Sequence, residues 1–181
     1  DVAAEHTGTT LAACLWQRGV LRVLHVGDSR VYCLRAGQLS RLTRDHSEVQ
    51  RLVDQGMLTP YQARTSPNRH LITQYIGMDP GDRDFQPTLS KPMEVMPGDR
   101  YLLCSDGLID MVEDEMIRRC LRKAHDAAEA VDTLVQHALD NGGHDNVTAL
   151  CIFVHAEGRA LWRVRWMTLL ATIRSGHKMT V

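Results

Sequence analysis

The first forty residues contain the feature that most constrains the fold. Short apolar runs there, "TTLAACLW", "VLRVLHV", "RVYCLR" and "QLSRLT", are separated by turns at Gly19, Gly27 and Gly37. Runs of this length, with glycine turns at this spacing, are typical of antiparallel hairpins in which one face of each strand is buried. The chain is therefore predicted to begin with an antiparallel β-meander.

Helical patterns appear after residue 45. The run "DHSEVQRLVDQG" has apolar residues at helical spacing and a stop at Gly56, and Thr59 to Gln62 read as a capping box with proline at the first helical position. Further helices are predicted over 111–123 and 126–139, and "YLLCS" and "VTALCIFVH" are predicted strands. Residues 65–92 are predicted to be long and partly irregular. At 181 residues the chain suits one domain with a real core.

Composition excludes some function classes. Lys and Arg number 21 against 22 Asp and Glu, so the charge gives no case for nucleic acid as the main partner. The five cysteines are far apart and never in C-x-x-C spacing, which predicts buried thiols in a reducing compartment, the cytoplasm. No apolar run is long enough for a transmembrane helix.

The segment 157–181 differs from the domain predicted over 1–156. From Gly158 onward it has no acidic residue, and Trp162 and Trp166 lie four apart among other apolar residues. Its basic residues are Arg159, Arg163, Arg165, Arg174 and Lys178. This tail is interpreted as a basic amphipathic helix for a membrane surface or a partner, as a helix packed on the domain, or as a disordered end.

Two aspartates are the candidates for chemistry. Asp106 directly follows one predicted strand, and Asp145, in "NGGHDNVT", lies just before another. If these strands are neighbours, about 5 Å apart, the two carboxylates meet at one edge and repel unless a cation lies between them. Mg²⁺ and Mn²⁺ prefer such oxygen ligands. The alternative is that both are ordinary turn or cap residues. His144 is interpreted as a surface residue rather than a ligand, and Arg30 as a structural partner of a carboxylate.

Five motifs occur in an order that resembles a known family. They are "GTT" (8–10), "VGDSR" (26–30), "LTRDHS" (42–47), "LLCSDGL" (102–108) and "GGHDNVT" (142–148). Together they resemble the successive motifs of the metal-dependent protein serine/threonine phosphatases, the PPM or type 2C family, in their bacterial form. The similarity covers about residues 7 to 155, and the segment 52–77 resembles the family's flap region.

The resemblance implies a fold and a set of site residues. The fold is α+β, a four-layer α/β/β/α sandwich of two antiparallel sheets flanked by helices, here incomplete at the N-terminus. Asp106 and Asp145 match carboxylates of the second metal, and Asp45 matches a residue that helps to hold a third. The structural motif positions are Gly8, Thr9, Gly27, Asp28, Arg30, Gly107 and Asn146. The implied cofactors are two Mn²⁺ or Mg²⁺ ions, with a third ion as an option.

The implied activity is hydrolysis of phosphoserine and phosphothreonine in proteins by a metal-bridging hydroxide, with no protein nucleophile. The implied partners are phosphorylated proteins, the substrates of a Hanks-type kinase in bacteria. A phosphatase acting on anti-sigma-factor antagonists is a further option, which the long flap and the intact "GDSR" disfavour.

Two family motifs are not found in this chain. They are an Arg followed by Asn-Glu-Asp, which binds phosphate, and an Asp-Gly-x-Gly-Gly strand end, whose Asp bridges the metals. The chain is therefore expected to be the C-terminal two thirds of a catalytic domain, weak or inactive alone and active in its full-length parent. The alternative is a catalytically impaired module that binds or regulates a partner. The flap has Ser66-Pro67 and Arg69-His70 where relatives often have His-Pro and Arg-Asn, so substrate choice is open.

Overall fold

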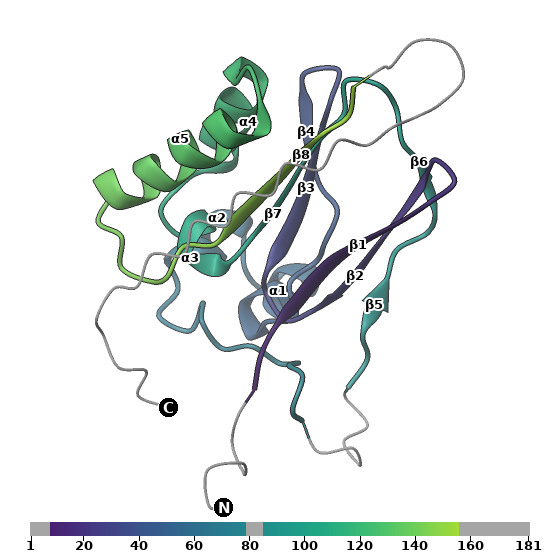
Figure 1. Cartoon of the computed structure of the whole chain (residues 1–181). Coiled ribbons are helices and arrows are strands. Elements are labelled where there is room, and N and C mark those ends of the chain that lie inside the picture. The colour runs from purple at the N-terminus through teal and green to yellow at the C-terminus, as the bar shows by residue number, and fades with distance from the viewer. Residues whose placement is uncertain (1–7, 79–84, 156–181) are drawn as a thin grey trace, which may run out of the picture. The chain divides into compact units, whose positions relative to one another are not determined.

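A computed structural model describes residues 8–78 and 85–155. The described residues form two compact units: the first draws on residues 8–31, 41–78 and 85–94, and the second on residues 32–40 and 95–155. The elements, shown in Figure 1, are β1 (Leu11–Gln17), β2 (Val20–Val26), β3 (Arg30–Arg35), β4 (Gln38–Arg41), α1 (Glu48–Asp54), α2 (Pro60–Thr65), β5 (Thr88–Leu89), β6 (Met93–Glu94), β7 (Arg100–Cys104), α3 (Asp106–Ile109), α4 (Asp114–Lys123), α5 (Ala127–Asp140) and β8 (Ala149–Phe153).

The sheet of the first unit has the order β1-β2-β5, and β6 pairs with β2. β1 and β2 form an antiparallel hairpin, whose turn has φ angles of 51° at Arg18 and 79° at Gly19. Two successive positive φ angles match the twist of a tight hairpin, and this explains the glycine in the turn. Alternate residues of β2, including Leu21, Val23 and His25, are buried, as the alternation of the sequence predicts.

Side chains cap the N-termini of both helices of the first unit. The Ser47 side chain accepts a hydrogen bond from the backbone N–H of Gln50 at the start of α1. Thr59 and Gln62 form the predicted capping box of α2, which has proline in its first turn. None of the residues of α2 is buried, so local capping rather than core packing accounts for this short helix.

The sheet of the second unit has the order β4-β3-β7-β8, and β7 and β8 pair antiparallel from Arg100↔Phe153 to Cys104↔Ala149. One cluster of buried residues joins this sheet to α3, α4 and α5, and α5 packs along β8 (Figure 1). Tyr32, Leu102 and Leu134 are among its fully buried members. This core holds in place the end of the sheet at which β7 ends and β8 begins.

The predicted helix over 111–123 is shorter in the structure. Asp114 and Glu115 form the first turn of α4, so the helix begins three residues later than predicted. Acidic side chains are favourable at a helix N-terminus, where the backbone N–H groups have no partner within the helix. A separate short helix, α3, precedes it. The helix predicted over 126–139 is confirmed as α5, with Asp126 as its N-cap.

A buried polar network lies beside the core of the second unit. The Asp99 side chain is fully buried and accepts hydrogen bonds from Arg35 Nε at 2.8 Å and Nη2 at 2.7 Å. The Tyr101 hydroxyl and the Met96 backbone N–H each donate to the same carboxylate at 2.8 Å. Burial raises the pKa of the Tyr101 hydroxyl, and its bond to Asp99 raises it further, so Tyr101 remains protonated.

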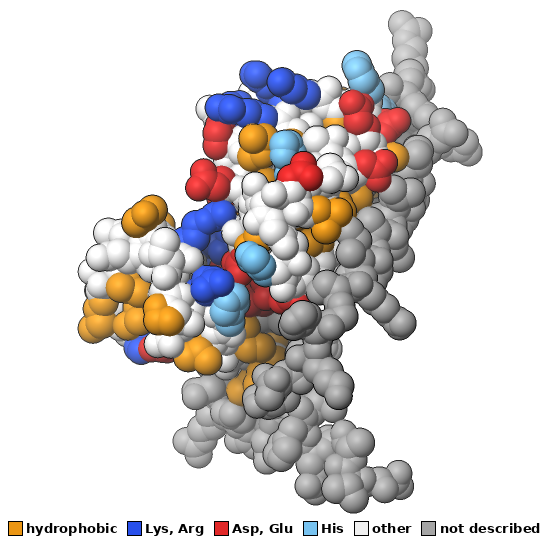
Figure 2. Space-filling view, turned by 90° about the vertical axis from the view of Figure 1, so that its left-hand side faces the viewer, with side chains coloured by type: hydrophobic (Ala, Val, Ile, Leu, Met, Phe, Trp, Pro, Cys, Tyr) orange, Lys and Arg blue, Asp and Glu red, His pale blue; other side chains and the backbone are white. Residues whose placement is uncertain are grey.

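The predicted fold class is confirmed: the structure is α+β, with two antiparallel sheets that have helices beside them. All five cysteines are free thiols, and only Cys14 is not buried. On the face shown in Figure 2, acidic and basic side chains are interspersed rather than gathered in one basic surface. A helix with the length and apolarity needed to cross a bilayer is not found between residues 8 and 78 or between 85 and 155. The predicted tail, 157–181, lies outside the described residues.

Candidate metal centre

The structure brings the segments of Asp106 and Asp145 together at one end of the second sheet. The ladder between β7 and β8 ends at Cys104↔Ala149, and hydrogen bonds of Ser105 continue it. The Ser105 N–H donates to Thr148 O at 3.0 Å, and Ser105 Oγ accepts from the Thr148 N–H at 3.0 Å. These bonds keep the segment after β7 and the segment before β8 side by side up to Asp106.

Gly107 then lies directly against the segment of Asp145. A Cβ atom on Gly107 would be 2.4 Å from the Asn146 carbonyl oxygen and 3.4 Å from the Asp145 carbonyl carbon. Real Cβ atoms essentially never approach another atom so closely, so only glycine allows this contact. The predicted structural positions Gly107 and Asn146 therefore touch each other, and they hold the two aspartates in neighbouring positions.

Each aspartate is oriented by its own next residue. Asp106, the first residue of α3, is half-buried, and its Oδ1 accepts a hydrogen bond from the Gly107 N–H at 2.9 Å. Asp145 is exposed, and its Oδ1 accepts from the Asn146 N–H at 2.6 Å. Two oriented carboxylate side chains are thus placed at a solvent-accessible rim.

This donor set fits a hard divalent cation in part. Carboxylate oxygens are the ligands that Mg²⁺ and Mn²⁺ prefer, and Mg²⁺ usually keeps several waters beside one or two carboxylates. Among residues 8–78 and 85–155, no three His, Cys, Asp or Glu side chains gather closely enough to enclose a metal ion. A cation held by Asp106 and Asp145 would therefore need further ligands from water or from residues outside the described ranges.

Gly107→Ala is expected to weaken Mn²⁺ binding by about tenfold or more, because a methyl group would push Asp106 away from Asp145 and such displacements of ligand supports typically weaken binding 10- to 100-fold. Isothermal titration with MnCl₂ measures the effect. Gly98→Ala is the control, since a Cβ there meets nothing within 4 Å, although its φ of +87° strains the backbone. Equal Mn²⁺ affinity in both variants would contradict the role of this contact.

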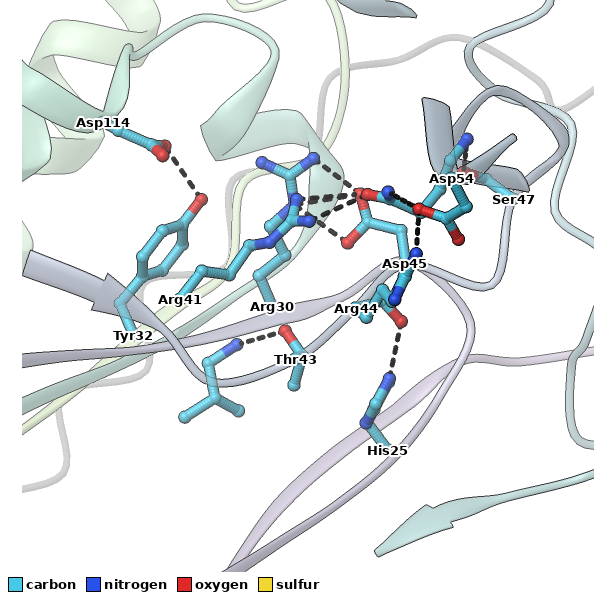
Figure 3. Close-up of polar contacts among 12 residues, drawn as sticks. His25, Arg30, Tyr32, Arg41, Thr43, Arg44, Asp45, Ser47, Asp54 and Asp114 are labelled. Carbon is cyan, nitrogen blue, oxygen red and sulfur yellow. Dashed lines mark hydrogen bonds and ion pairs between the residues drawn. The ribbon is translucent and has the colours of Figure 1, made fainter. Parts of the chain in front are cut away.

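Asp45 lies in the first unit and is held by two arginines (Figure 3). Arg30 Nη2 donates to Asp45 Oδ2 at 2.6 Å and Arg30 Nε lies 3.0 Å from Oδ1, while Arg41 Nη1 is 3.6 Å from Oδ2. The Asp45 side chain is only 9% exposed. Arg30 is therefore the structural partner of a carboxylate, as predicted. Both Asp45 oxygens are engaged by arginine, and its role as a metal ligand stays a prediction.

The other motif positions form contacts within the first unit. Gly27 has a φ of +97°, and a Cβ there would lie 2.3 Å from Thr10 Cγ2. Thr10 Oγ1 in turn lies 2.8 Å from Ser29 Oγ, beside Asp28. These contacts join "GTT" to "VGDSR" and agree with a structural role for that corner.

The start of the first described segment contacts the flap. Thr9 and Ile76 exchange two backbone hydrogen bonds, of 3.0 and 2.8 Å. A Cβ on Gly8 would lie 2.4 Å from the Tyr75 ring, so the ring rests directly on the glycine. The predicted positions Gly8 and Thr9 thus hold the chain near residues 75 and 76. His144 is exposed, as interpreted from the sequence.

A pair of histidines was not singled out from the sequence. The rings of His25 and His46 stack with centroids 4.6 Å apart. His25 Nε2 lies 2.8 Å from the Arg44 carbonyl oxygen (Figure 3). Burial, and then the nearby His25, lower the pKa of His46 against the opposing effect of Asp45, which favours the neutral ring. The inward position of His25 in the alternating "VLRVLHV" is the signal that could have revealed the pair.

Known proteins resemble this chain in sequence and in fold. No family model matches the chain. The chain is 44% identical over 146 residues to the serine/threonine protein phosphatase PstP of Mycobacterium tuberculosis (strain CDC 1551 / Oshkosh), covering 81% of this chain and 27% of PstP. It is 34% identical over 157 residues to the protein phosphatase PhpP of Streptococcus pneumoniae serotype 2, covering 87% of this chain and 62% of PhpP.

A solved structure extends the comparison to the fold. The crystal structure of the PstP catalytic domain in complex with two manganese ions matches with a TM-score of 0.70 at 44% identity, covering 80% of this chain and 58% of that one. In all three comparisons the chain spans less than two thirds of the length of the relative.

Proposed function

Since this chain belongs to the PPM-type (type 2C) family of metal-dependent protein serine/threonine phosphatases, we propose that it forms part of a catalytic domain that hydrolyses phosphoserine and phosphothreonine in proteins. The observation that carries the proposal is the close contact of Gly107 with Asn146, which places the backbone segments of Asp106 and Asp145 beside each other at the end of a sheet. Two carboxylates from these segments would suit a divalent cation.

The proposed cofactors are two Mn²⁺ or Mg²⁺ ions, with a third that Asp45 would help to hold. This rests on the ligand chemistry of Asp106 and Asp145 and on the two manganese ions of the related PstP structure. When bound, the ions would supply an acidified water and would stabilise charge on the phosphoryl group. The two aspartates would bind and orient the ions, and Asp106 would do so from the rigid start of α3.

The contributions of the protein would be mainly positional. Ser105 and Gly107 fix the backbone at Asp106, and hydrogen bonds from the Gly107 and Asn146 N–H groups orient the two carboxylates. A protein nucleophile is not part of the proposal. The proposed partners are phosphorylated proteins, the substrates of a Hanks-type kinase. The proposed location is the cytoplasm, which the five free thiols support.

We expect Mn²⁺-dependent phosphate release from a phosphothreonine peptide by the complete protein that contains this sequence, and little release by the 181-residue chain. The physical reason is that the described residues contain no group of three or more His, Cys, Asp or Glu side chains that could hold a metal ion. Released phosphate is measured with and without EDTA. A complete, folded protein that binds Mn²⁺ but releases no phosphate would exclude the enzyme and favour a phosphatase-like binding module.

A further inference from the structure

A side-chain hydrogen bond joins the start of the loop that carries Asp145 to the chain just after α3. Asn141, the C-cap of α5, donates from its side-chain Nδ2 to the Met111 backbone oxygen at 2.7 Å. Met111 follows the last residue of α3 by two positions, and Asn141 precedes Asp145 by four. The bond therefore connects the helix that Asp106 begins to the loop that carries Asp145.

The loop between α5 and β8 passes beside α3 (Figure 1). Three contacts join residues 105–111 to residues 141–148, and they occur in antiparallel order: Ser105 with Thr148, Gly107 with Asn146, and Met111 with Asn141. The first two lie next to Asp106, and the third lies beyond the other end of α3. Asp145 is placed between the second and the third contact, so its backbone is held on both sides.

Two glycines follow Asn141, and their positions depend on α5. Gly142 and Gly143 have φ angles of +120° and +53°, a region that favours glycine. The Gly142 N–H donates to Leu139 O and the Gly143 N–H to Ala138 O, each at 3.0 Å, which is the pattern of a Schellman motif. The turn is therefore fixed relative to α5, and the bond from Asn141 fixes the end of α5 relative to α3.

The side chain of Asn141 does more than end a helix. Its backbone N–H donates to His137 O at 3.1 Å, and any residue except proline could provide that bond. Its amide bonds instead to a segment 30 residues earlier in the chain. A hydrogen bond between exposed groups contributes little to the free energy of unfolding. Its main consequence is that it fixes the spacing of the two segments.

We propose that Asn141 is a positioning residue that sets the spacing of Asp106 and Asp145, and thereby the affinity of the divalent cation that these two carboxylates would share. This proposal rests on the proposed metal-dependent function. Asn141 is not itself proposed as a ligand, and it acts only through the backbone that carries the two aspartates. Removing a support of this kind typically weakens metal binding 10- to 100-fold.

Two substitutions of Asn141 separate the position of the ligands from the charge of the site. Asn141→Ala removes the amide and its bond. Asn141→Asp keeps the size and shape of the side chain, but its carboxylate cannot donate to the Met111 oxygen. A negative charge added four residues before Asp145 would by itself attract a cation. Loss of position and gain of charge therefore predict opposite changes of Mn²⁺ affinity in Asn141→Asp.

Gln136→Ala is the matched control. Gln136 is an exposed amide on the same helix, and its Nε2 donates to Asp140 Oδ1 at 2.8 Å. The substitution removes a hydrogen bond of the same kind that joins no second segment. The Mn²⁺ affinity of the complete protein is measured by titration with MnCl₂ alone, followed by the electron paramagnetic resonance of free Mn²⁺. Urea unfolding of the metal-free protein measures the stability of each variant.

We expect Asn141→Ala and Asn141→Asp each to weaken one Mn²⁺ site about tenfold or more, and Gln136→Ala to keep the affinity of the wild type. The urea midpoints of Asn141→Ala and Gln136→Ala should be close to each other, because each variant loses one exposed hydrogen bond. Wild-type affinity in Asn141→Ala would overturn the proposal. An Asn141→Asp variant that binds Mn²⁺ more tightly than the wild type, or an equal loss in Gln136→Ala, would also overturn it.

Phosphate release by the wild-type protein, measured separately, distinguishes this proposal from the proposed function. A wild-type protein that binds Mn²⁺, with variants that show the expected pattern, but that releases no phosphate would refute the phosphatase activity and leave the positioning role standing. A wild-type protein that releases phosphate, with Asn141 variants that keep its Mn²⁺ affinity, would refute only the positioning role. A wild-type protein that binds no Mn²⁺ would refute both.

Discussion

Asp106→Asn in the complete protein is expected to lower Mn²⁺-dependent phosphate release by about 100- to 1000-fold, because a bound metal contributes several kcal/mol to the transition state and each 1.4 kcal/mol is a factor of ten. Asparagine keeps an oxygen that can accept the Gly107 N–H, so the start of α3 is preserved and only the charge is removed. Initial rates with a phosphothreonine peptide measure the loss, and circular dichroism verifies the fold.

Asp145→Asn should act in the same direction, since the two carboxylates are proposed to share one ion. Asp132→Asn is the matched control, because Asp132 is an exposed aspartate within α5 and belongs to neither of the two segments that contain Asp106 and Asp145. Mn²⁺ affinity is measured for each variant by titration. Wild-type affinity and rate in both Asp106→Asn and Asp145→Asn, with intact folds, would show that these aspartates do not share a cation.

Arg35→Met is expected to destabilise the second unit by about 3 kcal/mol, the lower end of the range for breaking a buried ion pair. The variant leaves the fully buried Asp99 carboxylate without its cation, while methionine keeps an apolar stem of similar length. The lower end applies because the Arg35 side chain is 41% exposed, so water already screens the pair. Urea unfolding followed by circular dichroism gives the free energy.

The same network predicts a dependence on pH. Burial alone would raise the pKa of Asp99, but hydrogen bonds from Arg35, the Met96 N–H and Tyr101 outweigh it and hold the pKa below its ordinary value. A carboxyl with a lowered pKa in the folded state stabilises the fold above its unfolded pKa of about 4, and the contribution is lost as the pH falls through the folded pKa. The stability difference between wild type and Asp99→Asn should therefore shrink below about pH 4.

Glu115→Gln is the control for both measurements. Burial is negligible for Glu115, whose hydrogen bonds from Arg118 and Arg119 lower its pKa to about 2. Ion pairs between exposed side chains contribute little to stability, so little measurable change is expected. A loss in Glu115→Gln as large as that in Arg35→Met would show that burial of Asp99 is not the cause.

Much of the local structure could be predicted from short stretches of sequence. The hairpin of β1 and β2, the capping box at Thr59 and the N-cap Asp126 each depend on residues within a few positions of one another. Such signals are contained in the sequence because turn geometry and helix caps are satisfied locally. The start of α4 was predicted three residues too early because apolar periodicity continues through the turn before it.

The candidate residues Asp106 and Asp145 were also found from the sequence. Asp106 directly follows one apolar run and Asp145 lies just before another, where a carboxylate is unfavourable unless it has a partner. The proximity of their backbone segments depends on the tertiary structure. It requires β7 and β8 to pair in the register that places Cys104 opposite Ala149, and no local pattern fixes that register.

The sequence by itself determined the longer strands and helices and the pair of candidate aspartates, because periodicity, caps and turns act over a few residues. The order of its motifs implied the fold class. Only the tertiary structure decided that Arg30 holds Asp45, that Arg35 pairs with buried Asp99, and that the His46 ring joins Gly27 to Thr88. These contacts connect residues far apart in the chain, and the partner of a charged or polar side chain depends on which segments packing brings within hydrogen-bond distance.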